Sequence, residues 1–80
     1  MPQSFREAAK WYLEAADGGH AAAQNNLGSL CESGRGVAQS DAEAAKWYAA
    51  AAQQGNARAQ SNLAYLHAHR RVGVPPLPGS

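Results

Sequence analysis

The amino-acid sequence predicts an all-α fold, a right-handed superhelix (solenoid) of about four helices arranged as antiparallel pairs. Two observations support this prediction: a long internal repeat, and apolar residues that recur at helical spacing inside each repeat. No segment alternates between apolar and polar residues with the period of two that a half-buried strand shows. The sequence therefore predicts helix pairs stacked side by side along the chain.

The internal repeat is the strongest signal in the sequence. Residues from Glu7 onward run EAAKWYLEAADGGHAAAQNNLGSL, and they align without a gap to EAAKWYAAAAQQGNARAQSNLAYL, which begins at Glu43 with an offset of 36 residues. The block EAAKWY returns unchanged, and Gly, Asn and Leu residues beyond it return at the same spacing. A period in the thirties is typical of solenoids built from stacked helix pairs.

The first predicted helix pair occupies the N-terminal half. A helix is expected at about 4–18, because Ser4 and the glutamate three residues later form a capping box. Gly19 supplies the left-handed backbone conformation with which many helices end. A second helix is expected at about 20–33, before the loop Gly34-Arg-Gly-Val37.

The second predicted pair repeats this plan. A third helix is expected at about 40–54, where the same Ser-x-x-Glu capping box precedes it and Gly55 follows it. A fourth helix is expected at about 56–70. It begins at Asn56, a better N-cap than His20 at the start of the second helix.

The large apolar and aromatic side chains recur at equivalent positions of both units, which favours packing between helices over an aromatic binding surface. Gly28 lies beside this stripe, where its small size lets two helix axes approach closely. Cys31 lies in the same stripe and is expected to be a buried, inert thiol. The predicted packing residues are Trp11, Tyr12, Leu27, Leu30, Trp47, Tyr48, Leu63 and Leu66.

A set of small, apolar and aromatic residues spans the central unit at fixed spacings: Ala23, Leu27, Gly28, Cys31, Gly34, Gly36, Val37, Asp41, Ala44 or Ala45, Trp47, Ala51, Ala52 and Gly55. This pattern resembles the Sel-1-like repeat family, a relative of the tetratricopeptide repeat with a slightly longer unit. The resemblance implies one full unit at about 20–55 between two half units, within a repeat domain at 1–72. A disordered, Pro-rich tail is expected at 73–80.

The sequence departs from the family pattern in two places. Cys31 and His67 stand where the family has Tyr, and the second unit lacks the Gly-x-Gly-Val loop. The family likeness implies a curved stack whose concave side binds partner proteins or peptides, as an adaptor or scaffold. The candidate recognition residues are polar side chains of the inner helices: Gln24, Asn25, Asn26, Ser29, Gln60, Ser61, Asn62 and Tyr65.

Two alternatives stay open at this stage. Gln24 and Asn26 recur in the second unit, so a structural role for these amides competes with peptide binding. In addition, Phe5 and Tyr12 of the first helix have no preceding helix to cover them. A homodimer that joins open solenoid ends is therefore the alternative to a protein- or peptide-binding module.

Other classes of function find little support. The chain has one cysteine, and His67 and His69 are two apart on a helix, so neither an enzyme nor a cofactor or metal site is expected. The net charge of +1 provides no strong electrostatic attraction to nucleic acid, so no nucleic-acid partner is expected. The most apolar stretch, residues 42–52, is too short to span a bilayer, so no membrane partner is expected. A cytoplasmic location is the default expectation.

Overall fold

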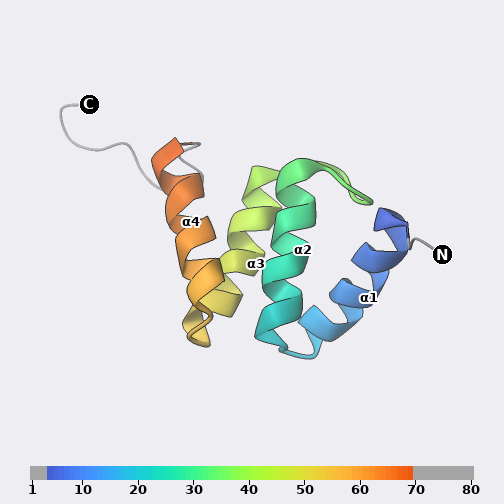
Figure 1. Ribbon diagram of the computed structural model, residues 1–80, viewed down its shortest axis with the longest axis horizontal. Helices are drawn as coiled ribbons and strands as arrows, with labels where there is room; N and C mark the ends of the chain where they lie inside the picture. The colour runs from blue at the N-terminus through green and yellow to red at the C-terminus, as the bar shows by residue number, and fades with distance from the viewer. Residues whose placement is uncertain (1–3, 70–80) are drawn as a thin grey trace.

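The computed structural model describes residues 4–69, and these residues form four α-helices joined by short connections (Figure 1). The helices are α1 (Phe5–Asp17), α2 (Ala21–Ser33), α3 (Asp41–Gln53) and α4 (Ala57–His69). The predicted all-α fold is confirmed. The predicted tail at 73–80 lies outside the described residues, as do residues 1–3 and 70–72 of the predicted repeat domain at 1–72.

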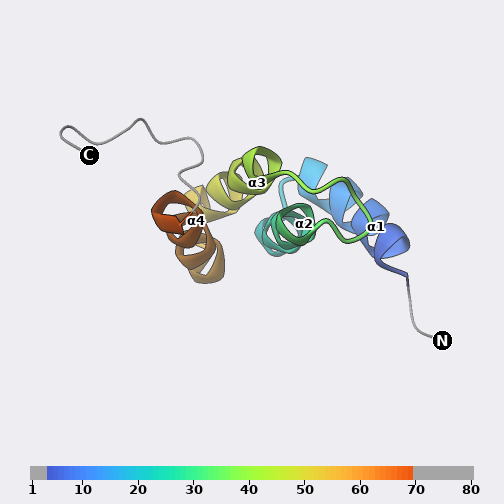
Figure 2. The same cartoon turned by 90° about the horizontal axis from the view of Figure 1, so that it is seen from above.

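The helices follow one another in chain order along the long axis of the molecule, from α1 at one end to α4 at the other (Figures 1 and 2). Each helix packs on the next one in the chain, and the contact between α2 and α3 is the most extensive. The two central helices α2 and α3 are therefore covered on both sides, whereas α1 and α4 each have one side without a described neighbour.

The helix starts use the capping residues that the sequence predicts. The hydroxyl oxygen of Ser4 accepts a 3.1 Å hydrogen bond from the Glu7 backbone N–H, and Ser40 accepts the equivalent bond in the second unit. The Oδ1 atom of Asn56 accepts a 2.8 Å bond from the backbone N–H of Ala59, whereas His20 makes no side-chain cap bond. Each such cap stabilises a helix by about 1 kcal/mol.

The loop between the two units depends on Gly36. Its φ angle is +76°, and a Cβ atom at this position would overlap the carbonyl group of Phe5. No side chain fits there, because the loop crosses directly over the backbone at the start of α1. Arg35 lies in the same loop with its guanidinium 5.1 Å from the centre of the Phe5 ring. The loop is thus tied to the first helix.

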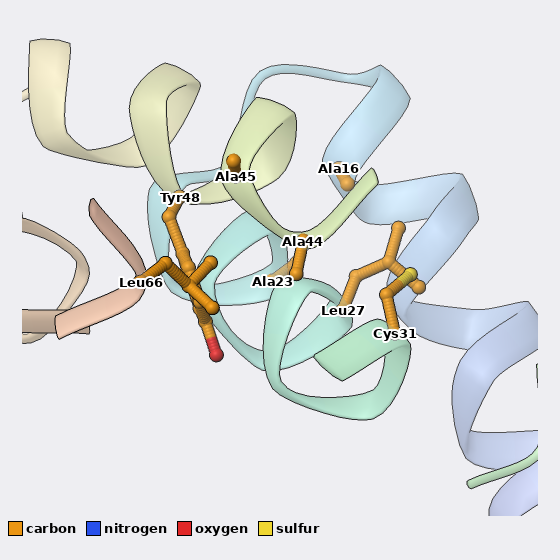
Figure 3. Packing of buried hydrophobic residues seen from close by; sticks show 8 residues of the cluster. All are labelled: Ala16, Ala23, Leu27, Cys31, Ala44, Ala45, Tyr48 and Leu66. Carbon is orange, nitrogen blue, oxygen red and sulfur yellow. The ribbon is translucent and has the colours of Figure 1, made fainter. Parts of the chain in front are cut away.

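The hydrophobic core is centred on the junction of α2 and α3, with Ala16 added from α1 and Leu66 from α4 (Figure 3). Tyr48 and Leu66 are its largest fully buried side chains. A Cβ atom on Gly28 would lie 2.7 Å from the Tyr48 ring and 3.2 Å from the Ala44 carbonyl oxygen. The absence of a side chain at Gly28 therefore allows α2 and α3 to approach closely.

The burial of the predicted packing residues is uneven. Leu27, Leu30, Tyr48 and Leu66 are buried, and Tyr12, Trp47 and Leu63 are half-buried. Trp11 differs from the expectation, because 62% of its surface is exposed. The reason is its position: the equivalent Trp47 packs against the hydrophobic core and lines the groove between α1 and α3, whereas no helix precedes α1 among the described residues.

Candidate protein-interaction surface

The amide of Gln24 is used inside the fold. Gln24 is 6% exposed, and its Nε2 donates to the carbonyl oxygen of Ala16 at 3.1 Å. Its Oε1 accepts a 2.9 Å bond from Nε2 of Gln54. In the second unit, Gln60 repeats the first of these bonds by donating to the Ala52 carbonyl. The recurring glutamine therefore ties each inner helix to the end of the helix before it, and the structural alternative fits Gln24.

Asn25 is also occupied by contacts within the chain. It is 8% exposed, and its Oδ1 accepts a 2.9 Å bond from Nδ2 of Asn62. This bond connects α2 directly to α4, two helices that α3 separates in the chain. Sequence reasoning placed Asn25 among the surface residues because the second unit has Ser61 at the equivalent position. The pairing joins positions offset by 37 residues, one more than the repeat, so the alignment of the units does not reveal it.

The remaining candidates face solvent. Four of them are exposed on the inner helices α2 and α4: Asn26, Ser29, Ser61 and Tyr65. We call this set the inner polar face. Gln60 is exposed beside it. Half of the Tyr65 surface is exposed, and its ring centre lies 4.3 Å from that of His69 one helical turn further along α4. The structure thus separates the predicted set into amides that hold the helices together and side chains that are available to a partner.

A shallow hollow of about 250 Å³ opens at the N-terminal end of the inner polar face. Helix α2 contributes Asn26 and Ser29 to this hollow, together with Leu30 and Ser33. Helix α1 contributes Phe5, Ala8 and Tyr12. The loop adds Arg35, so the hollow combines three small polar side chains and a guanidinium group with an aromatic wall.

A larger groove of about 640 Å³ lies between α1 and α3. Its floor and walls are apolar and include Leu13, Leu27, Val37 and Trp47. Its charged lining residues are Arg6, Lys10, Asp17, Glu43 and Lys46. The sequence did not predict this groove, because the residues that form it are spread over three helices and a loop.

Cys31 lies in the wall of this groove but is 6% exposed. Burial raises the pKa of its thiol, and the nearby carboxylate of Glu43 raises it further. A protonated, buried thiol is a poor nucleophile and a poor metal ligand. Within residues 4–69, no group of three or more His, Cys, Asp or Glu side chains is placed to hold a metal ion. None of the described helices is long and apolar enough to cross a membrane.

The four stacked helices and the repeated packing positions define a helical-repeat protein. The Sel1 repeat model matches residues 1–20, 21–56 and 57–78, and the chain belongs to the Sel1 repeat family. Proteins of this family are helical repeats that generally act as protein-interaction modules. The expected family resemblance is thereby confirmed.

The fold is also similar to a solved structure. The crystal structure of a Sel1 repeat protein from Oxalobacter formigenes superimposes with a TM-score of 0.84 at 39% sequence identity. The alignment covers 92% of this chain and 30% of that protein, so the chain spans about a third of its relative's length. The comparison with curated proteins gives no match.

Proposed function

We propose that this chain is a protein- or peptide-binding module that acts as an adaptor or scaffold through its inner polar face. The observation that supports this proposal is the pair Ser29 and Tyr65. These residues hold equivalent positions of the two units, both are exposed, and they differ although the surrounding scaffold repeats. A solvent-exposed position that differs between otherwise similar repeats is free to serve recognition, because the core does not constrain it.

The chemistry of the inner polar face suits an extended peptide. The exposed amide of Asn26 offers both a donor and an acceptor, the pair that a peptide backbone presents in return. Tyr65 offers a rigid aromatic ring of which half is exposed, and such a ring contributes contact area at a low entropic cost. The ligand class is therefore an extended segment with an apolar or proline side chain placed over Tyr65.

Selection of peptides from a random displayed library against the full chain tests this proposal. The selected peptide is then titrated into isotopically labelled protein, and the backbone amide shifts locate its site. We expect the shifts to centre on Asn26 and Tyr65, and Tyr65→Ala to weaken binding about tenfold or more. Lys46→Ala is the matched control, because Lys46 is exposed on α3 and lines the groove instead.

Two results would contradict the proposal that the inner polar face is the peptide-binding site. One is that the library yields no peptide that binds the folded chain. The other is that bound peptides change the amide shifts of residues that line the groove between α1 and α3. Their affinity would then be lowered by Lys46→Ala and not by Tyr65→Ala. The second result would support the binding function and would place its site in the groove between α1 and α3.

A separate observation favours self-association as a second candidate function. Phe5 is 52% exposed and Trp11 is 62% exposed, and both lie on α1 at one end of the row of helices. Large exposed aromatic side chains favour association, because a second protein that covers them removes apolar surface from water. Homo-association is therefore the alternative proposal, and molar mass in solution over a range of concentrations tests it.

A further inference from the structure

We propose that copies of this chain join head to tail, so that α4 of one copy docks on α1 of the next as α2 docks on α3 within the chain. The proposal rests on the self-association suggested above and specifies its geometry. Its basis is the repeat itself: α1 and α3 share the block EAAKWY, and α2 and α4 share Ala, Gln, Asn and Leu at equivalent positions. The α2–α3 junction therefore shows how α4 and α1 fit together.

The N-terminal end presents one half of such a junction. On α3, the inward face is closed between α2 and α4, with Ala44 and Ala51 0% exposed and Tyr48 1% exposed. On α1 the same face is open on the side away from α2. The equivalent residues of α1 are only half-buried: Ala8, Tyr12 and Ala15. Within residues 4–69, α3 has a preceding inner helix and α1 has none.

The C-terminal end presents the other half. Leu27, Gly28 and Cys31 of α2 are buried, and they form the side of α2 that meets α3. Their equivalents on α4 are more exposed: Leu63 and His67 are half-buried and Ala64 is exposed. No described helix follows α4 to cover them. The open side of α4 is thus the counterpart of the open side of α1.

One polar contact has a specific partner in this arrangement. Within the chain, Asn62 of α4 donates to Asn25 of α2. The equivalent of Asn62 is Asn26, which lies exposed in the hollow at the N-terminal end. The equivalent of Asn25 is Ser61, which is exposed on α4 and carries a hydroxyl oxygen that can accept a bond. Head-to-tail docking brings Asn26 to Ser61 of the preceding copy, whose α4 docks on α1.

Two substitutions make this joint weaker than the internal one. Ala64 replaces the glycine that lets Tyr48 approach, so Tyr12 must shift away from the added Cβ atom. Ala68 replaces Glu32, which accepts a 2.8 Å bond from the Tyr48 hydroxyl. Among the described residues the Tyr12 hydroxyl has no hydrogen-bond partner, so its ring is free to make that shift. The joint is therefore reversible and depends on concentration.

The geometry of the joint determines how the assembly grows. An interface between two different surfaces leaves one free end on each terminal copy, so it extends into an open array unless the rotation closes a ring. A symmetric dimer uses the same surface on both copies and stops at two. The two modes of association are therefore distinguishable by variants that block one end at a time.

The experiment compares Ala64→Arg, which blocks the C-terminal end, with Ala8→Arg, which blocks the N-terminal end where the hollow leaves room for the side chain. Ala22→Arg is the matched control, because Ala22 is exposed and the second unit carries Arg58 at the equivalent position. Molar mass is measured by light scattering up to about 1 mM, where even weak association is populated. Circular dichroism shows that each variant is folded, and Trp11→Ala replaces Ala8→Arg if the latter is not.

The wild-type chain and Ala22→Arg are expected to exceed twice the monomer mass of 8.4 kDa and to keep growing with concentration. Each blocked variant alone is expected to stay monomeric, with association weakened at least about tenfold. An equimolar mixture of the two blocked variants retains one competent pair of ends and is expected to stop at a dimer. If Ala64→Arg alone still dimerises, self-association stands and the head-to-tail geometry is overturned. If the wild-type chain is monomeric throughout, both are overturned.

Discussion

The substitution Gly28→Ala tests the close contact between α2 and α3. Its added Cβ atom would lie 2.7 Å from the Cδ1 and Cε1 atoms of Tyr48 and 3.2 Å from the Ala44 carbonyl oxygen. Carbon atoms in contact normally lie about 3.5–4.0 Å apart, so the helices must separate or the ring must turn. Neither is easy, because Tyr48 is 1% exposed and its hydroxyl is bonded to Glu32.

Two opposing terms set the size of the effect. Overpacking of a well-packed core costs about 1–3 kcal/mol, and the rigid surroundings of Tyr48 place this site toward the upper end. Replacing glycine inside a helix gains back about 1 kcal/mol. The expected net loss is therefore about 1–2 kcal/mol, which for a domain of this size lowers Tm by at least about 4 °C.

Thermal unfolding followed by circular dichroism measures this loss, with Ala64→Gly as the matched control. Ala64 holds the equivalent position in α4 and is exposed, so the reverse substitution reports the helix-propensity term alone, about 1 kcal/mol. These melts are run at a low protein concentration, so that association does not contribute to Tm. A Gly28→Ala variant with an unchanged or higher Tm would refute the close approach of α2 and α3.

Two further predictions concern buried polar groups. Asn62→Ala should destabilise the fold by about 1–3 kcal/mol, because it leaves the Oδ1 atom of Asn25 buried without a partner. Asn26→Ala at the equivalent exposed position should change stability by no more than about 0.5 kcal/mol, and equal losses in chemical denaturation would contradict this assignment. The free energy of unfolding should also fall as the pH rises above 9.0, the ordinary thiol pKa. Unfolded Cys31 then loses its proton, while burial and Glu43 keep the folded pKa higher. Urea unfolding from pH 8 to 10 should show that the free energy of unfolding falls less in Cys31→Val than in the wild-type chain. An identical fall in both proteins would exclude the Cys31 thiol as its cause.

The fold was predictable from the sequence because its signals are local or periodic. A serine three residues before a glutamate specifies the starts of α1 and α3, Asn56 specifies the start of α4, and a repeat of helix pairs specifies a stack. The burial of Leu27 and Leu66 follows from their positions in that periodic pattern. Predicting where the helices begin and end, and which residues form the central core, therefore requires no knowledge of contacts between distant residues.

The candidate site was less predictable, because exposure depends on contacts that a repeat alignment does not contain. Asn25 differs from Ser61 at the equivalent position, which suggested a surface role, yet the bond from Asn62 holds it in the interior. The groove between α1 and α3, which Trp47 lines, depends on the distance between these two helices, and no sequence spacing specifies that distance. Variation between units identifies recognition residues only where the structure also leaves them exposed.

The two copies of EAAKWY show how strongly position in a solenoid governs the role of a residue. Tyr48 and Tyr12 share their sequence neighbours, yet Tyr48 is 1% exposed, whereas Tyr12 is half-buried. Trp47 packs against the hydrophobic core, whereas 62% of Trp11 is exposed. The sequence of the motif is the same, so the difference arises from the neighbouring helix. Residue types that form the core where a described helix covers them are thus exposed where no described helix does.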